Sequence, residues 1–359
     1  MIYKVLSHDE VEELNNELRS RLPGTAKIFY VIRSWLAGLL PGKEVIVDAW
    51  PEWTSIVLRT ADANKVQPFF RHTYMCHARS ASALKYFLQR PDVVDWRKPA
   101  TFTGVPRDVA PVISTMTVKH RGRVTSLEPR FMYAWTKTEL PAIPEIPEGL
   151  YLGKLRVEDA TVLRRDWEGH RYREDMEGYF RTVIESFDSS CLRDASGELQ
   201  AYACMQFNGS IAMLYVKPDH RDEDYFKIVL SDLARKRLEN GEVAYGFIPT
   251  NDSDLVDQMR SIDFVWVPRG DMVWMHFEPL QVNRTNDASM MTSTAQNGNE
   301  SVSFDCVCSD HAKRSTQKSF SHCRQEHDGS FLPTAQASSE NIGNLKDSHL
   351  TLVSVSPTS

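Results

Sequence analysis

The stretch from Glu198 to Gly241 constrains the fold of this chain more than any other part. It predicts a strand, a two-residue Asn208-Gly209 turn, a second strand at Ile211 to Val216, a polar corner and a helix that ends at Gly241. Asn-Gly is typical of a type I′ hairpin, because both central residues of that turn need a positive φ. Apolar residues recur at helical spacing after the corner: Phe226, Val229, Leu230, Leu233, Ala234 and Leu238. A strand therefore leads through a charged corner into the start of a helix.

The start of that helix is a candidate binding site for a phosphorylated ligand. Unpaired backbone N–H groups and the positive end of the helix dipole face whatever lies beyond the strand. The carboxylate of Asp219 lies in the same corner. A solvated turn between a strand and a helix is the commoner explanation of such a pattern, so this stretch alone does not establish a site.

Length and charge exclude several classes of protein. The chain has 359 residues, which is more than one typical domain, and a formal net charge of −6. That charge argues against a protein that binds nucleic acid by neutralising phosphates. No apolar run approaches the length that spans a bilayer. The six cysteines, three of which (Cys76, Cys191 and Cys204) lie in the globular part, indicate reduced thiols inside a cell.

The N-terminus, from Met1 to Leu22, predicts an amphipathic helix on the surface. Ser7 and Glu10 have the spacing of a capping box, in which each side chain accepts a hydrogen bond from the other residue's backbone N–H. The segment lacks the apolar centre of a secretory signal and is too acidic for a transit peptide.

The remaining first half predicts strands with intervening helices, and therefore a mixed sheet. The expected strands are Lys27 to Arg33, Glu44 to Asp48, Ser55 to Arg59, His72 to His77 and Arg130 to Trp135, with helices at Ala81 to Gln89 and Val109 to Val118. Prolines in Thr136 to Gly149 break any regular element and indicate a linker. We expect an N-terminal domain at 1–140, a linker at 141–150 and a C-terminal domain at 151–280.

The second half predicts the order β α α β β β α β α β β, closed by strands at Phe264 to Val267 and Met272 to Phe277. Residues 281–359 are rich in Ser, Thr, Asn and Gln without periodicity, and so predict a disordered tail. Cysteines and histidines in the tail do not have the spacing of a zinc site, and no metal is expected: Cys306, Cys308, His311, Cys323 and His327.

This order of elements resembles the GNAT acyltransferase superfamily, and the chain more narrowly resembles the glycine N-acyltransferase family from Leu14 to Leu280. The resemblance rests on the order and spacing of several short segments: Val47 to Trp53, Asp95 to Lys98, Arg130 to Tyr133, Lys217 to Arg221, Asn251 to Ser253 and Val267 to Arg269. It implies an α/β fold with a mixed sheet and two GNAT-like domains, of which the first is degenerate and the second holds the active site. It also suggests a mitochondrial protein, although the chain shows no presequence.

The resemblance implies a mechanism in which an acyl group moves from coenzyme A to the amine of a small amino acid, with glycine as the expected acceptor. Acyl-CoA is expected between two splayed parallel strands, with its pyrophosphate at the helix that follows Arg221. Backbone N–H groups at Leu214, Tyr215 and Val216 would polarise the thioester carbonyl. Asn251 is expected to cap the helix that follows it, and a contact with CoA would be additional. Asp219 occupies the family position of the general base, which takes a proton from the ammonium before nitrogen attacks.

This sequence departs from the family pattern at two points. The base is Asp rather than Glu, and its shorter side chain calls for a bridging water. The glycines that let a backbone approach the pyrophosphate are both absent from the corresponding run, Arg221 to Phe226. The three carboxylates of that run, Asp222, Glu223 and Asp224, repel phosphate.

Two alternatives to a glycine N-acyltransferase therefore stay open. One is a pseudoenzyme that keeps the fold as an interaction module. The other is a transferase that acts on lysines or N-termini of proteins.

Overall fold

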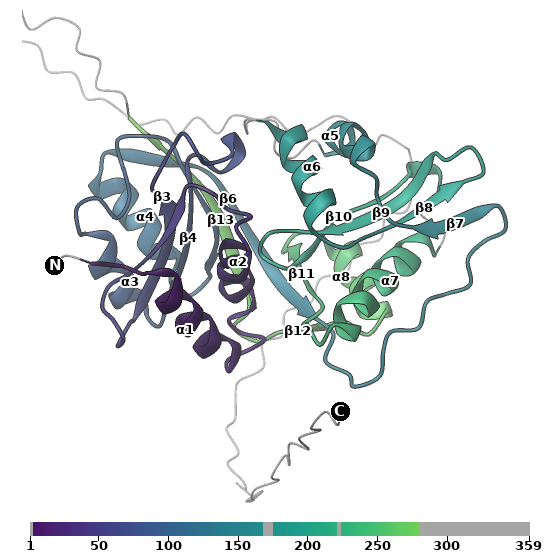
Figure 1. Cartoon of the computed structure of the whole chain (residues 1–359), viewed down its shortest axis with the longest axis horizontal. Coiled ribbons are helices and arrows are strands. Elements are labelled where there is room, and N and C mark those ends of the chain that lie inside the picture. Colours follow the sequence, from purple (N-terminus) through teal and green to yellow (C-terminus); the bar gives the residue numbers. More distant parts are fainter. Residues whose placement is uncertain (1–2, 168–174, 221–223, 281–359) are drawn as a thin grey trace, which may run out of the picture. The chain divides into compact units, whose positions relative to one another are not determined.

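The computed structural model describes residues 3–167, 175–220 and 224–280 (Figure 1). The predicted tail, its cysteines and histidines, and Arg221 to Glu223 lie outside the described residues. None of the helices in the described ranges is both long and apolar enough to cross a membrane. The helices are α1 His8–Arg19, α2 Ala26–Leu36, α3 Ala81–Leu88, α4 Ala110–Lys119, α5 Ala160–Asp166, α6 Met176–Ser186, α7 Tyr225–Glu239 and α8 Ser253–Ser261.

The strands form a mixed sheet in the order β1-β2-β3-β4-β5-β13-β6-β11-β10-β9-β8-β7, and β12 also pairs with β6. The pairs β4–β5 and β10–β11 are parallel, whereas the other neighbours are antiparallel. The strands are β1 Lys4–Val5, β2 Lys43–Val47, β3 Ser55–Thr60, β4 Thr73–Ala78, β5 Ala100–Pro106, β6 Gly122–Ala134, β7 Leu150–Gly153, β8 Ser189–Asp194, β9 Leu199–Met205, β10 Ile211–Val216, β11 Tyr245–Pro249, β12 Val265–Trp266 and β13 Met272–Pro279. The predicted mixed α/β fold is confirmed.

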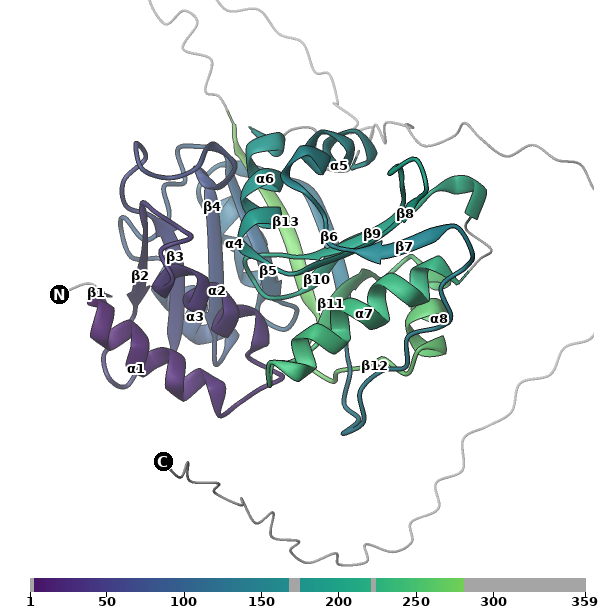
Figure 2. The same ribbon diagram turned by 45° about the vertical axis from the view of Figure 1, so that its right-hand side comes forward.

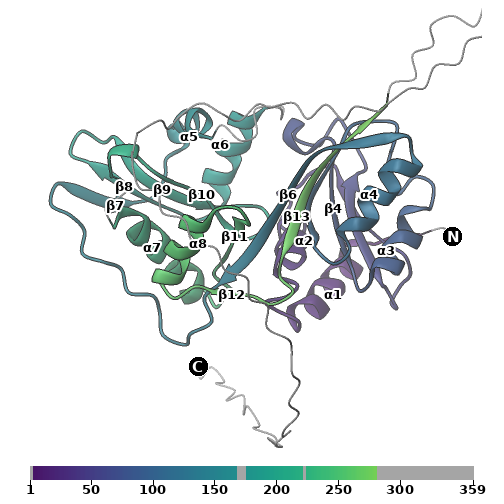
Figure 3. The same cartoon turned by 180° about the vertical axis from the view of Figure 1, so that it is seen from behind.

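The long strand β6 and the last strand β13 join the N-terminal half (residues 3–140) to the C-terminal half (residues 150–280). β13 comes last in the chain but lies between β5 and β6, in the sheet of the N-terminal half (Figure 3). β6 pairs with β13 along residues 122–130 and with β11 along residues 130–134. The sequence does not predict that β13 pairs with strands of the N-terminal half. The domain boundaries at 140 and 151 stay a prediction.

Helices cover both faces of the sheet, as the views in Figures 1 and 2 show. Alternate residues of β2 enter different cores: Val45 and Val47 pack with α1 and α2, whereas Ile46 packs with α3 and α4. The core under α1 and α2 continues beneath α5 and α6 of the C-terminal half, and a third core lies under α7 and α8. Packing on the α1, α2, α5, α6 face therefore links the halves a second time.

The first helix confirms its predicted cap. The Ser7 N–H donates to Glu10 Oε2 at 2.9 Å, and the Glu10 N–H donates to Ser7 Oγ at 3.4 Å.

The strand predicted at Lys27 to Arg33 is wrong, because these residues form α2. Aromatic and β-branched residues in that run suggest a strand, but the helix is buried on nearly all sides. Periodicity does not distinguish a buried helix from a buried strand in such a short apolar run.

The hairpin predicted at Asn208-Gly209 is present, but its turn type is not I′. Gly209 has a φ of 75°, Asn208 has no positive φ, and the Gly209 N–H donates to the Gln206 carbonyl at 2.7 Å. This loop packs against α2, where a Cβ at Gly209 would lie 2.4 Å from Tyr30 Cγ. Ser34 of α2 also donates to the Phe207 carbonyl at 2.7 Å. Glycine is therefore required here both by conformation and by the close approach of α2.

Gly209→Ala should destabilise the protein more than the matched change Gly197→Ala. Both glycines have a positive φ (75° and 86°), but a Cβ at Gly197 meets no heavy atom within 4 Å. Backbone strain costs roughly 1–2 kcal/mol at either site, and the clash with Tyr30 should add about 1–3 kcal/mol. Urea unfolding of both variants measures the difference, and equal losses would contradict the close contact.

Candidate functional site

The parallel strands β10 and β11 separate after a short contact. Their register contains one pair, Ile211 with Gly246. On its other side β10 pairs with β9, but the register shifts between Ala212 and Tyr215, and Met213 has a φ of 54°. Such a bulge takes residues out of the ladder and bends the strand. The predicted splay between these strands is confirmed.

A cavity of about 340 Å³ lies in this splay, and we call it the strand-gap cavity. Its lining is mostly apolar and combines both strands with α7 and α8, including Leu214, Tyr215, Leu230, Ile248, Leu255, Met259 and Phe264. A narrow apolar chain can therefore pass between the strands, with the backbone of the bulge beside it.

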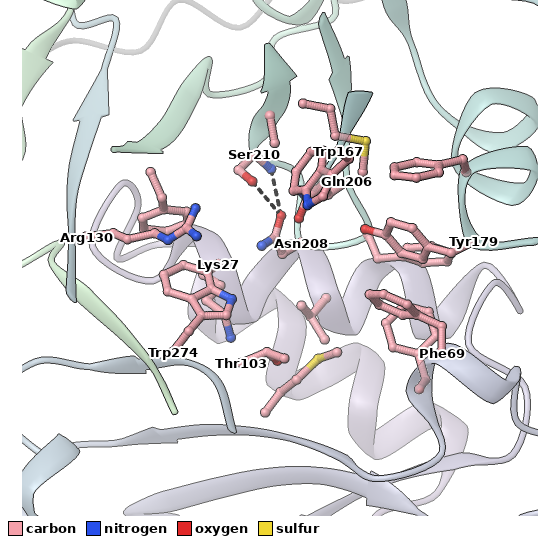
Figure 4. A pocket seen from close by; sticks show the side chains of 18 of the residues that line it. Lys27, Phe69, Thr103, Arg130, Trp167, Tyr179, Gln206, Asn208, Ser210 and Trp274 are labelled. Atoms are coloured by element: carbon pink, nitrogen blue, oxygen red, sulfur yellow. Dashed lines mark hydrogen bonds between the residues drawn. The ribbon is translucent and has the colours of Figure 1, made fainter. Parts of the chain in front are cut away.

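A second cavity of about 80 Å³, the inner cavity, adjoins the first and lies between the halves (Figure 4). The cavities share the lining residues Arg130, Trp167, Gln206, Ala212, Met213 and Phe247. Figure 4 shows Lys27, Arg130 and Trp274 on one side, with Phe69 and Tyr179 on the other. The rings of Phe69 and Tyr179 stack with their centroids 3.9 Å apart. The inner cavity thus has a cationic end and an aromatic end.

Lys27 is the most unusual residue of this site. It lies on α2 and is 3% exposed, and its Nζ has no hydrogen-bond partner among the described residues. Burial lowers the pKa of Lys27 from 10.5 to about 8. The neighbouring Cys76 supplies no counter-charge, because burial raises the pKa of its thiol to about 12. The ammonium group is therefore a largely uncompensated charge at pH 7.

Arg130 of β6 is the charged residue common to both cavities. Its Nη2 donates to Glu128 Oε2 at 2.9 Å, and its guanidinium lies 5.0 Å from the centre of the Trp274 ring. Its Nε is buried and has no hydrogen-bond partner within the described residues. Arg130 is thus held at the boundary of the two cavities with a donor still available.

The strand-gap cavity also contains a carboxylate. Asp166, at the end of α5, has a side chain 7% exposed and pairs with Arg165 Nε at 2.9 Å. Its Oδ2 accepts a hydrogen bond from the Tyr202 hydroxyl at 3.3 Å. Burial and the Asp166 charge raise the pKa of Tyr202, so this hydroxyl stays protonated at neutral pH. Asp166 and Tyr202 are therefore a carboxylate and a proton donor next to the splayed strands.

The residues predicted for the site divide between the cavity and the surface. Leu214 and Tyr215 line the strand-gap cavity, whereas Val216 is half-buried and does not line it. Asp219 is exposed in a single 3₁₀ turn, Pro218–His220, and lines neither cavity. Arg221 lies outside the described residues. The roles assigned to these residues stay predictions.

Asn251 is exposed and lines neither cavity, and its predicted role as a helix cap is wrong. Asp252 caps α8 instead, because its Oδ1 accepts a hydrogen bond from the Leu255 N–H at 3.0 Å. Either residue type is a good cap, so the sequence alone does not distinguish a cap at one position from a cap at the next.

The sequence does not predict the roles of Lys27, Arg130, Asp166 or Tyr202 at the cavities. A charged residue at the start of an otherwise apolar run was the available signal for Lys27. The predicted strand gave this lysine no special role, because a charged residue at the end of a strand is ordinarily exposed to solvent. Arg130 contributes to the family resemblance but carries no predicted role, and Asp166 and Tyr202 lack any distinguishing motif.

The chain is similar to known proteins at the level of a family profile, of individual relatives and of a solved structure. The profile of a family described as aralkyl acyl-CoA:amino acid N-acyltransferase matches residues 2–188, which is more than half of the chain. This chain belongs to that family. The predicted family resemblance is confirmed, and membership in the N-acyltransferase family makes acyl transfer the class of activity.

Individual relatives have low sequence identity to this chain but match it over most of its length. Glycine N-acyltransferase from Bos taurus is 20% identical over 288 residues, which cover 75% of this chain and 97% of the relative. Glycine N-acyltransferase-like protein Keg1 from Rattus norvegicus is 20% identical over 242 residues, 62% of this chain and 81% of the relative. A Drosophila protein of known crystal structure is 16% identical, with a TM-score of 0.64 over 77% of this chain and 99% of its own. The last comparison shows that the fold of this N-acyltransferase family member has a solved counterpart.

Lys27→Met should raise the free energy of unfolding at pH 7 by about 3 kcal/mol, because a tenfold change in proton affinity is worth about 1.4 kcal/mol. The folded pKa of Lys27 is about 8, below its ordinary value of 10.5. Between those pH values the unfolded chain binds the proton more tightly, so wild-type stability rises with pH and the advantage of the variant shrinks.

Denaturant unfolding at pH 7 and pH 9.5 measures this prediction. Lys85→Met is the matched control, because Lys85 is exposed on α3 and its removal should leave stability nearly unchanged at both pH values. A loss of stability in Lys27→Met at pH 7 would mean that the ammonium group stabilises the folded protein.

Proposed function

We propose that this protein transfers an acyl group from an acyl-CoA thioester to the amine of a small amino acid, with glycine as the first candidate. The observation that carries the proposal is a pair of adjoining cavities: an apolar cavity between splayed strands shares six lining residues with a small cavity that has a cationic end. Family membership supports the reaction, and relatives named glycine N-acyltransferase support the choice of acceptor.

The strand-gap cavity suits the pantetheine arm and its thioester. Its apolar walls accept a narrow chain, and the bulge at Met213 frees backbone polar groups of β10 at the point where the thioester carbonyl would lie. The predicted pyrophosphate position is the start of α7. Asp224 is the N-cap residue there, and its carboxylate pairs with Lys227 Nζ at 2.7 Å, which offsets part of the negative charge.

The reaction needs one proton acceptor and one stabilised leaving group. The ammonium of the acceptor loses one proton to a base, and the amine nitrogen attacks the thioester carbonyl carbon. This nitrogen loses a second proton as the C–S bond breaks, and the departing CoA sulfur takes up one proton, so that the products are the N-acyl amino acid and the CoA thiol. Asp219 is the proposed base on the family resemblance, and its exposed position calls for a water between its carboxylate and the amine. The Tyr202 hydroxyl is a candidate donor that protonates the departing sulfur.

Acyl-CoA should bind the full chain and support glycine-dependent release of CoA. Mass spectrometry of the acylglycine product, with acetyl-CoA and benzoyl-CoA as donors, measures turnover. Thermal unfolding measures binding, since a ligand at 100 times its Kd stabilises a protein by about 2.7 kcal/mol. If neither product nor stabilisation appears at millimolar acyl-CoA, the enzyme proposal fails and the interaction module becomes the better interpretation.

Asp219→Asn should lower kcat by about 10²-fold or more, because it removes the general base, while the Kd for acyl-CoA stays unchanged. Asp166→Asn is the comparison variant, since Asp166 is the carboxylate that lines the strand-gap cavity. It should lose less turnover than Asp219→Asn, because it changes the acceptor of the Tyr202 hydroxyl rather than the proposed base. The opposite pattern, with activity lost in Asp166→Asn and kept in Asp219→Asn, would assign the base to Asp166.

A further inference from the structure

The cationic end of the inner cavity contains several buried donors that have no partner among the described residues. They are Lys27 Nζ, Thr103 Oγ1 and Arg130 Nε, and all three residues line the inner cavity. Buried polar groups are nearly always hydrogen-bonded in folded proteins, and an unpaired buried charge is the most costly exception. Three such donors around one small space indicate a ligand that accepts hydrogen bonds.

The surrounding structure is built to bring Lys27 into this space. Gly104 of β5 has a φ of 63°, and a Cβ there would lie 2.4 Å from Lys27 Cε and 3.2 Å from Trp274 Cη2. The absence of a side chain at Gly104 therefore lets the lysine side chain pass along β5, beside Trp274. Figure 4 shows Lys27, Trp274 and Thr103 together at this end of the cavity.

The positive charges of Lys27 and Arg130 have no counter-charge inside the inner cavity, because none of the described residues that line it is an Asp or a Glu. Glu128 pairs with Arg130 but does not line the cavity. His77, near Lys27, is neutral at pH 7, because burial first and the Lys27 charge second lower its pKa to about 4. The charge of the cavity is therefore positive, and the occupant that best offsets it is an anion.

The chemistry of the donors favours a carboxylate. An ammonium, a hydroxyl and a guanidinium N–H match the two oxygens of one carboxylate, which accept several hydrogen bonds. A cavity of about 80 Å³ holds only a small molecule. Arg130, Gln206, Ala212 and Met213 also line the strand-gap cavity, where the thioester is proposed to lie. A carboxylate at Lys27 would therefore direct the other end of a short molecule toward the thioester.

We propose that Lys27, Thr103 and Arg130 form a carboxylate-binding subsite that holds the acceptor amino acid and selects it over amines that lack a carboxylate. This inference rests on the proposed function, since it gives the inner cavity to the acceptor. The subsite also explains why a destabilising lysine lies in the core: a buried cation costs stability in the free protein and is offset only when the ligand binds.

Binding of N-acetylglycine and of its neutral amide, N-acetylglycinamide, tests the subsite without any turnover. Isothermal titration of the full chain should give an affinity for N-acetylglycine about 30-fold or more above that for the amide, because the charge pair is buried. Lys27→Met should reduce this ratio to near one, with a melting temperature no lower than that of the wild type. Thr103→Val, which keeps the side-chain shape, should reduce the ratio several-fold.

The control Lys85→Met removes the same charge from an exposed position and should keep the full ratio. Equal affinities for the two compounds in the wild type, undetectable binding of both, or an unchanged ratio in folded Lys27→Met and Thr103→Val would each overturn the subsite. Acyl transfer to glycine and to glycinamide with equal efficiency would keep the proposed function but refute the subsite. Conversely, selective N-acetylglycine binding without any acyl transfer would keep the subsite and refute the proposed function.

Discussion

The structure depends on the packing of α2 between the two halves. This helix lies on the sheet of the N-terminal half and contacts the 206–210 loop of the C-terminal half so closely that Gly209 has no space for a Cβ. The Tyr30 hydroxyl accepts a hydrogen bond from the Val243 N–H at 2.9 Å, which ties α2 to the segment before β11. A helix fixed at both halves is a rigid support, and it carries the lysine that lines the inner cavity.

Regular local patterns were enough to predict much of the fold. The capping box of α1, the strands β2 and β3, the splay of β10 and β11 and the helix α7 ending near Gly241 all follow from capping, periodicity or resemblance. The cap of α1 and the helical spacing of α7 report their structure directly. The strands β2 and β3 are short runs rich in β-branched residues, which favour strands even where both faces are buried. Where a segment is buried on nearly all sides, as in α2, periodicity disappears and the prediction fails.

The candidate site was predictable only in part, for a related reason. Strand residues such as Leu214 and Tyr215 were assigned to ligand binding through the family resemblance, and they line the strand-gap cavity. The inner cavity is formed by residues far apart in the chain, such as Lys27, Thr103 and Asn208, which only tertiary packing brings together. No spacing rule connects them. The exposed position of Asp219 likewise depends on how the corner after β10 turns, which composition does not specify.

The position of β13 has a consequence for how the chain becomes folded. Strands β5 and β6 of the N-terminal half leave between them a place that is filled only by residues 272–279. During synthesis, the sheet of the N-terminal half therefore stays incomplete until residues 272–279 have left the ribosome. Until then the edges of β5 and β6 that pair with β13 have no partner there, and unpaired strand edges favour aggregation. Cooperative, late completion rather than domain-by-domain folding is the expected course for this chain.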